Sequence, residues 1–125
     1  MIEEISPRDL QARLAAPEPP LVLDVREVWE RDIARLPGTV DIPMGEVPGR
    51  LAELPKDRDI VVMCRSGGRS LKVSQFLDKS GYRVANLAGG ILAWSRDIDP
   101  TLRTYQAARG SRPRRGLVHQ PPYLI

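Results

Sequence analysis

The chain has 125 residues, of which 42% are hydrophobic and 28% are charged, a composition typical of one soluble globular domain. No apolar run reaches the roughly 20 residues that a membrane span requires. The acidic start Met1-Ile2-Glu3-Glu4 lacks the apolar stretch of a secretory signal. We therefore expect a cytoplasmic protein that does not associate with a membrane.

The formal net charge of +3 is unevenly distributed along the chain. Residues 1–102 contain 14 Lys and Arg against 16 Asp and Glu, whereas residues 103–125 contain five Arg and no acidic residue. We interpret residues 1–102 as the folded domain and residues 103–125 as a basic, Pro- and Gly-containing tail with little order. A basic tail can bind nucleic acid, but aromatic side chains do not alternate with these arginines to stack on bases. The sequence therefore predicts no nucleic-acid partner.

The first half of the chain opens with a predicted helix. Ser6 can cap this helix, and Pro7 suits its first position, so the helix is expected to run to about Ala15. Four further elements follow in chain order. They are a buried strand over 21–25, a short helix over 26–33, a strand over 39–42 and a weak helix over 46–54.

The second half contains the strongest strand signal, the run 59–64, which ends at Cys64. A helix is predicted over 70–79, with apolar residues on one face. A further strand over 83–87 and a last helix over 90–97 complete the pattern. Strands and helices therefore alternate along the domain.

This alternation predicts an α/β fold with a mostly parallel central sheet of about five strands and helices on both faces. Ligands of such sheets bind beyond the carboxyl ends of the strands. Because Cys64 closes the strongest strand, the topology places it at that end of the sheet.

Cys64 is the only cysteine, and His119 is the only histidine. No intramolecular disulfide, Cys-x-x-Cys dithiol or four-ligand Cys/His zinc site can therefore form. The sequence predicts neither a metal nor a cofactor. A lone cysteine is more often a small buried apolar residue than a nucleophile, so its neighbours must decide its role.

Those neighbours favour a reactive sulfur. Cys64 is followed by Arg65, Ser66, Gly67, Gly68, Arg69 and Ser70, which lead into a helix. Two glycines let the backbone fold tightly, with several N–H groups aimed at an anion. The N-terminus of the helix and the two arginines add positive charge. We therefore expect a Cys64 thiolate that is open to solvent.

Sulfur transfer suits this thiolate because it needs no partner histidine, whereas cysteine proteases and acyltransferases usually do. A Cys-dependent phosphatase or arsenate reductase is the main alternative. Such phosphatases place five residues between the cysteine and an arginine. Here four residues separate Cys64 from Arg69, and Ser70 stands at the phosphatase arginine position. A non-catalytic binding module is the third possibility.

Four segments resemble, in the same order, the motifs of the rhodanese family, and the resemblance extends from residue 5 to about residue 100. Residues 64–70 are similar to its active-site loop, Cys-x-x-Gly-x-Arg-Ser. The other three segments are residues 24–30, 36–43 and 86–94. The resemblance implies a rhodanese fold, a persulfide on Cys64, and a substrate held by the loop 65–70. It also implies that Arg65 and Arg69 steer anionic donors such as thiosulfate.

The resemblance has consequences for other residues and for partners. Family members often carry His at the position of Arg35, which concerns only local packing or surface charge. Asp24 is expected either to orient a loop arginine or to form a structural ion pair, and Trp29 and Trp94 are expected to pack in or beside the core. Residues 94–100 also resemble, more weakly, rhodanese domains fused to adenylating enzymes. The implied partners are a small-molecule or protein sulfur donor and a possible sulfur-carrier acceptor, while the sequence predicts no oligomeric state.

Overall fold

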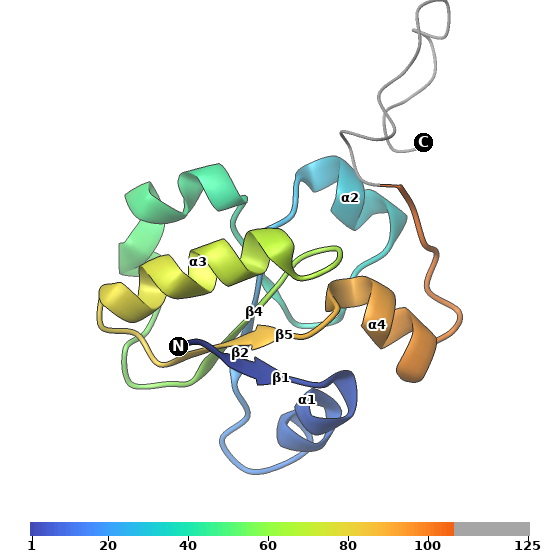
Figure 1. Ribbon diagram of the computed structural model, residues 1–125, viewed down its shortest axis with the longest axis horizontal. Coiled ribbons are helices and arrows are strands. Elements are labelled where there is room, and N and C mark those ends of the chain that lie inside the picture. Colours follow the sequence, from blue (N-terminus) through green and yellow to red (C-terminus); the bar gives the residue numbers. More distant parts are fainter. Residues whose placement is uncertain (107–125) are drawn as a thin grey trace, which may run out of the picture.

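The computed structural model describes residues 1–106 (Figure 1). Five strands alternate with helices along this part of the chain. The strands are β1 (Glu3–Ile5), β2 (Leu21–Asp24), β3 (Val40–Asp41), β4 (Ile60–Met63) and β5 (Val84–Leu87). The helices are α1 (Pro7–Leu14), α2 (Val28–Ile33), the 3-10 helix η1 (Met44–Glu53), α3 (Gly68–Lys79) and α4 (Gly90–Asp97).

The strands form one sheet in the order β1-β5-β4-β2-β3, and every pairing is parallel. This confirms the predicted α/β class and the sheet of about five strands. The sequence analysis did not identify β1, because only Ile5 of its three residues is buried and the segment has no apolar run. β4 lies at the centre of the sheet, so the residue that follows it lies in the middle of the carboxyl edge.

The two faces of the sheet carry separate apolar clusters. Every residue of β2 and β4 is buried, as expected for strands covered on both sides. Successive side chains alternate between the clusters, so that Val61 and Met63 pack toward one and Ile60 and Val62 toward the other. α1, α2 and α4 contribute to the first cluster, and α3 and η1 cover the second (Figure 1).

Two helices differ from the prediction in ways that matter for the site. α3 begins at Gly68, two residues before the predicted start, because Gly67 takes a left-handed conformation with φ of 110° that lets the helix start at once. η1 is a 3-10 helix with Pro48 inside it, since proline removes an α-helical N–H donor. The loop after β4 is therefore short and leads directly into a helix N-terminus.

Tyr105 is buried, at 8% exposure, although the sequence analysis assigned it to the tail. Its position beside α2 is described below. The prediction of little order for the rest of the tail, which includes His119, lies outside the described residues. In the described part of the chain, no helix has the length and apolar character needed to cross a bilayer.

Candidate active site

Cys64 follows β4 and lies where the carboxyl edge of the sheet meets the start of α3. The backbone N–H of Gly67 donates to Sγ over 3.1 Å, and the N–H of Ser70 donates over 3.4 Å. The left-handed Gly67 turns the chain back over the sulfur and makes this approach possible. Two amide dipoles therefore point at Sγ, an arrangement that stabilises negative charge.

The Ser70 hydroxyl links the sulfur to β5. Its Oγ lies 3.3 Å from Sγ of Cys64 and 2.5 Å from Oδ1 of Asn86. A hydroxyl donates one hydrogen, and the shorter distance favours donation to Asn86. The Asn86 amide in turn donates to the Gly67 carbonyl over 3.1 Å. Asn86, which the sequence analysis did not single out, thus holds both ends of the turn around the sulfur.

The expectation that the sulfur is open to solvent is wrong, because Cys64 is only 1% exposed. The turn before α4 lies against the loop, where the N–H of Ile91 donates to the Cys64 carbonyl over 2.9 Å. Gly90 makes this approach possible, since a Cβ there would collide with the carbonyls of Cys64 and Arg65. Cys64 itself packs in the apolar cluster that α3 and η1 cover, so it is buried while its polar donors stay aimed at the sulfur.

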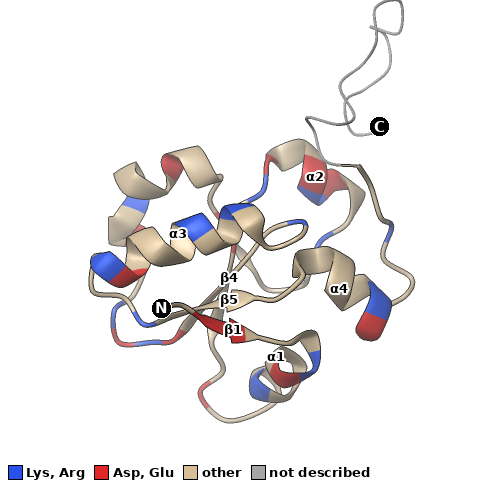
Figure 2. Ribbon diagram, in the orientation of Figure 1, with Lys and Arg blue, Asp and Glu red and all other residues tan. Residues whose placement is uncertain are grey.

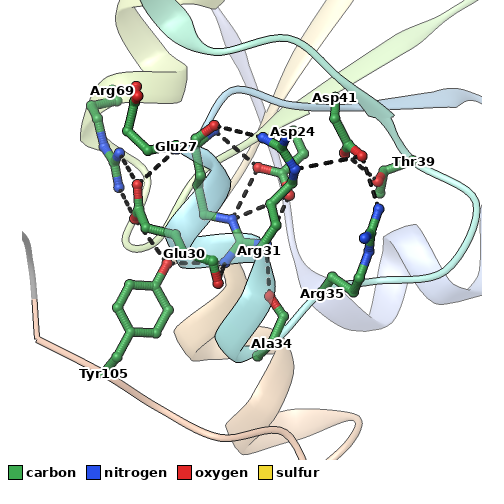
Figure 3. A network of polar contacts seen from close by, with 11 residues as sticks. Asp24, Glu27, Glu30, Arg31, Ala34, Arg35, Thr39, Asp41, Arg69 and Tyr105 are labelled. Carbon is green, nitrogen blue, oxygen red and sulfur yellow. Dashed lines mark hydrogen bonds and ion pairs between the residues drawn. The ribbon is translucent and has the colours of Figure 1, made fainter. Parts of the chain in front are cut away.

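Arg69 is paired with Glu30 of α2 in a two-point ion pair (Figure 3). Both Nη–Oε distances are 2.7 Å, and Glu30 is 1% exposed. Burial alone would raise the pKa of Glu30, but hydrogen bonds from Arg69 and from the Glu27 N–H outweigh it and lower the pKa below 4.5. The same pair raises the pKa of Arg69. The charge of Arg69 is thus largely compensated by its partner.

Arg65 has different partners. Its Nε donates to the backbone carbonyl of Tyr105 over 2.6 Å, and its guanidinium carbon lies 5.6 Å from the centre of the Tyr105 ring. Among residues 1–106, no carboxylate lies within ion-pair distance of Arg65. Arg65 therefore carries the less compensated of the two loop charges.

Asp24 forms a structural ion pair, the second of the two roles considered for it. Its carboxylate binds the guanidinium of Arg26 with Nη2–Oδ2 at 2.8 Å, and both side chains are fully buried. Arg26 also donates to the Ala34 carbonyl and to the Tyr105 hydroxyl. Asp24 thus fixes the segment that leads into α2, and Glu30 is the residue that holds a loop arginine.

The other residues singled out in the sequence lie at the surface or in the core. Ser66 and Gly68 are exposed at the outer side of the loop. Arg35, at the position where the family often has His, forms a surface pair with Asp41 at 2.9 Å. Trp94 is buried in the core, and Trp29 packs against the same cluster, as expected.

Three contributors escaped the sequence analysis: Glu30, Asn86 and Tyr105. Glu30 stands three residues after Glu27, a spacing typical of a capping box, and the box is present. That pattern could have drawn attention to the carboxylate, although not to its partner 39 residues away. Asn86 opens the segment 86–94, but nothing in that segment indicates its contacts with Ser70 and Gly67, and Tyr105 lies outside all four segments.

Comparisons with known proteins identify the family of this chain. The Rhodanese-like domain family matches residues 6–97. A protein from Allochromatium vinosum named "Sulfurtransferase" is 44% identical over 97 residues, which cover 77% of this chain and 91% of that protein. A Drosophila yakuba protein, "Adenylyltransferase and sulfurtransferase MOCS3", is 31% identical over 112 residues, covering 82% of this chain and 24% of that protein. The weaker resemblance to fused rhodanese domains is confirmed, and these relatives support sulfur transfer as the class of activity.

Solved structures show the same fold. A rhodanese-like domain protein from Staphylococcus aureus superposes with a TM-score of 0.73 at 28% identity, covering 84% of this chain and all of that chain. A thiosulfate sulfurtransferase from Pseudomonas aeruginosa gives a TM-score of 0.69 at 29% identity, covering 76% of this chain and 19% of that chain. The fold is the rhodanese fold. The family match spans β2 to β5 and the whole loop around Cys64, and on this ground the chain belongs to the rhodanese-like domain family.

Proposed function

We propose that the chain is a sulfurtransferase that carries a sulfane sulfur as a persulfide on Cys64. The observation that supports this most directly is the convergence of the Gly67 and Ser70 N–H groups on Sγ. Such donors stabilise a thiolate before transfer and a persulfide anion after it. The family match and the sulfurtransferase relatives point to the same class of chemistry.

With thiosulfate as donor, the reaction balances without a cofactor. The Cys64 thiolate attacks the outer sulfur, an S–S bond forms, and the S–S bond of thiosulfate breaks. The bonding electron pair leaves with sulfite, which departs as an anion and needs no proton. An acceptor such as cyanide then removes the outer sulfur and restores the thiolate. A protein donor or a sulfur-carrier acceptor would use the same two steps.

Arg65 is the better placed of the two arginines to attract an anionic donor. Arg69 is held by a buried carboxylate at 2.7 Å, whereas Arg65 binds a carbonyl and an aromatic ring. A charge that no carboxylate compensates attracts an anion more strongly. Arg65 therefore steers the donor, and Arg69 chiefly shapes the loop.

Access to the sulfur requires a local opening, because Cys64 is 1% exposed. Ser66 and Gly68 form the exposed outer side of the loop. A Cβ added at Gly68 would have no neighbouring atom within 4 Å, so the space beside this residue is open. A small displacement of the loop at Ser66 would admit a donor while α3, which begins at Gly68, stays in place.

Thiocyanate formation from thiosulfate and cyanide tests the proposal. We expect steady turnover by the full chain and none by Cys64→Ser. The matched control is Ser80→Ala, which alters a serine at the opposite end of α3 from Cys64 and should retain most of the activity. Turnover that persists in Cys64→Ser would contradict the proposal. Faster hydrolysis of an aryl phosphate than sulfur transfer would favour the phosphatase alternative instead.

A further inference from the structure

The segment after α4 returns to the active-site end of the molecule. Figure 1 shows the chain leaving α4 and running up beside α2. Tyr105, in this segment, is buried at 8% exposure. It lies beyond residues 6–97, which the family match covers, so the family match does not include it.

The ring and the backbone of Tyr105 hold Arg65. The ring packs edge-on against Trp29 with centroids 5.9 Å apart, which fixes its position. The guanidinium carbon of Arg65 lies over the Tyr105 ring, 5.6 Å from its centre. The Nε of Arg65 donates to the Tyr105 carbonyl over 2.6 Å. A flexible arginine with a cation–π contact and a hydrogen bond to one residue loses most of its freedom.

The hydroxyl of Tyr105 holds the other arginine through a carboxylate (Figure 3). It accepts from Nη1 of Arg26 over 3.0 Å and donates to Oε1 of Glu30 over 2.9 Å. The same Oε1 accepts from Nη2 of Arg69 over 2.7 Å. Burial raises the pKa of Tyr105 to about 12, so the hydroxyl keeps its proton and remains a donor at neutral pH.

We propose that Tyr105 is a positioning residue that fixes Arg65 directly and Arg69 through Glu30, and thereby sets the preference of Cys64 for anionic reagents. For sulfur transfer this role rests on the proposed function. The positions of the two arginines do not, so the charge preference of the sulfur can be measured with any reagent that attacks it.

Alkylation provides that measurement, because Cys64 is the only cysteine. Iodoacetate is an anion and iodoacetamide is its neutral analogue. We expect the ratio of their rates at Cys64 to fall about threefold in Tyr105→Phe, which loses only the hydroxyl contacts. We expect a fall of about tenfold in Tyr105→Ala, which also loses the ring that fixes Arg65. A loss of stability alone would alter both rates together and leave the ratio unchanged.

Tyr82→Phe is the matched control. Tyr82 is buried to a similar degree, at 7% exposure, and its hydroxyl donates to the Leu51 carbonyl on the other face of the sheet. We expect its ratio to equal that of the unaltered chain. If Tyr105→Ala fails to fold, the ratio in Tyr105→Phe decides. A ratio unchanged in the folded Tyr105 variants, or lowered equally in Tyr82→Phe, would overturn the proposal.

The same variants connect the inference to sulfur transfer. We expect Tyr105→Phe to raise the KM for thiosulfate several-fold with little change in kcat, since a charged donor is bound less well while the sulfur is unaltered. A changed alkylation ratio in a chain that transfers no sulfur would refute the proposed function and leave the positioning role standing. An unchanged KM together with an unchanged ratio would refute the positioning role alone.

Discussion

The two ends of the sheet carry ion-pair networks of opposite character. At the amino end, Asp59 binds both Arg13 and Arg83, and the three side chains are 46%, 36% and 59% exposed. At the carboxyl end, Asp24, Arg26 and Glu30 are almost fully buried, and Glu30 binds the half-buried Arg69. Figure 2 shows acidic and basic residues interspersed over both ends, so net charge does not distinguish them.

Burial is what distinguishes the two networks. Exposed ion pairs are screened by water and gain little free energy from their attraction. Buried groups must have all their hydrogen bonds satisfied, because an unpaired buried charge is costly. The four contacts of the Glu30 carboxylate fulfil this requirement. The buried network therefore fixes the positions of the side chains around Cys64, whereas the exposed network of Asp59 contributes little to the structure at the amino end of the sheet.

The largest loss of stability should follow removal of the buried carboxylate of Glu30. We expect Glu30→Ala to lower the free energy of unfolding by about 3–5 kcal/mol, because it leaves Arg69 and the Tyr105 hydroxyl without their partner in a buried site. Urea denaturation followed by circular dichroism measures this. A loss below about 1 kcal/mol, as for an exposed pair, would contradict the difference in stability between the buried and the exposed networks.

Acid should lower the free energy of unfolding through protonation of Glu30. The pKa of Glu30 is lowered in the folded state, so its stabilising contribution is complete above the ordinary value of 4.5 and is lost as the pH falls through the lower, folded-state pKa. We expect the free energy of unfolding to fall less steeply below pH 4.5 in Glu30→Gln than in the unaltered chain. Parallel pH profiles of the two proteins would contradict this.

A smaller effect is expected at the sulfur itself. Ser70→Ala removes the hydroxyl that lies 3.3 Å from Sγ and binds Asn86, while both amide donors to the sulfur remain. We expect the rate of thiocyanate formation to fall about tenfold, since the Ser70–Asn86 hydrogen bond that holds the turn around the sulfur is lost. Loss of all activity would mean that the hydroxyl, and not the amides, stabilises the anion.

The smallest effect should come from the amino end. Asp59→Ala breaks two exposed pairs, and we expect a loss of less than about 1 kcal/mol in stability. Sulfur transfer should stay unchanged, because the substitution lies at the opposite edge of the sheet from Cys64. An activity loss comparable to that of Ser70→Ala would show that the two ends are coupled.

Local patterns predicted the fold class, four of the five strands and the active-site loop. The apolar runs predicted β2, β4 and β5, and the glycines after Cys64 predicted the turn whose amides reach Sγ. The residues that escaped prediction act across long sequence separations. Glu30 binds Arg69 across 39 residues, and Tyr105 binds Glu30 across 75. The residues next to Glu30 indicate a capping box, but they do not indicate its pairing with Arg69 or Tyr105.

Burial of the sulfur was unpredictable for the same reason. The glycines at 67 and 68 indicate a tight loop, but Cys64 packs in the apolar cluster that α3 and η1 cover, and the turn before α4 docks through Gly90 on the carbonyl groups of Cys64 and Arg65. A pair of glycines before a helix is consistent with any tight turn. Only the parallel pairing of β4 with β5 brings that turn to the loop.

Intact-mass spectrometry after incubation with thiosulfate tests the central claim most directly. Transfer to Cys64 predicts a species heavier by about 32 Da, the mass of one persulfide sulfur, which cyanide removes and which Cys64→Ser never forms. An unchanged mass in the folded, thiosulfate-treated chain, or the same increase in Cys64→Ser, would contradict it.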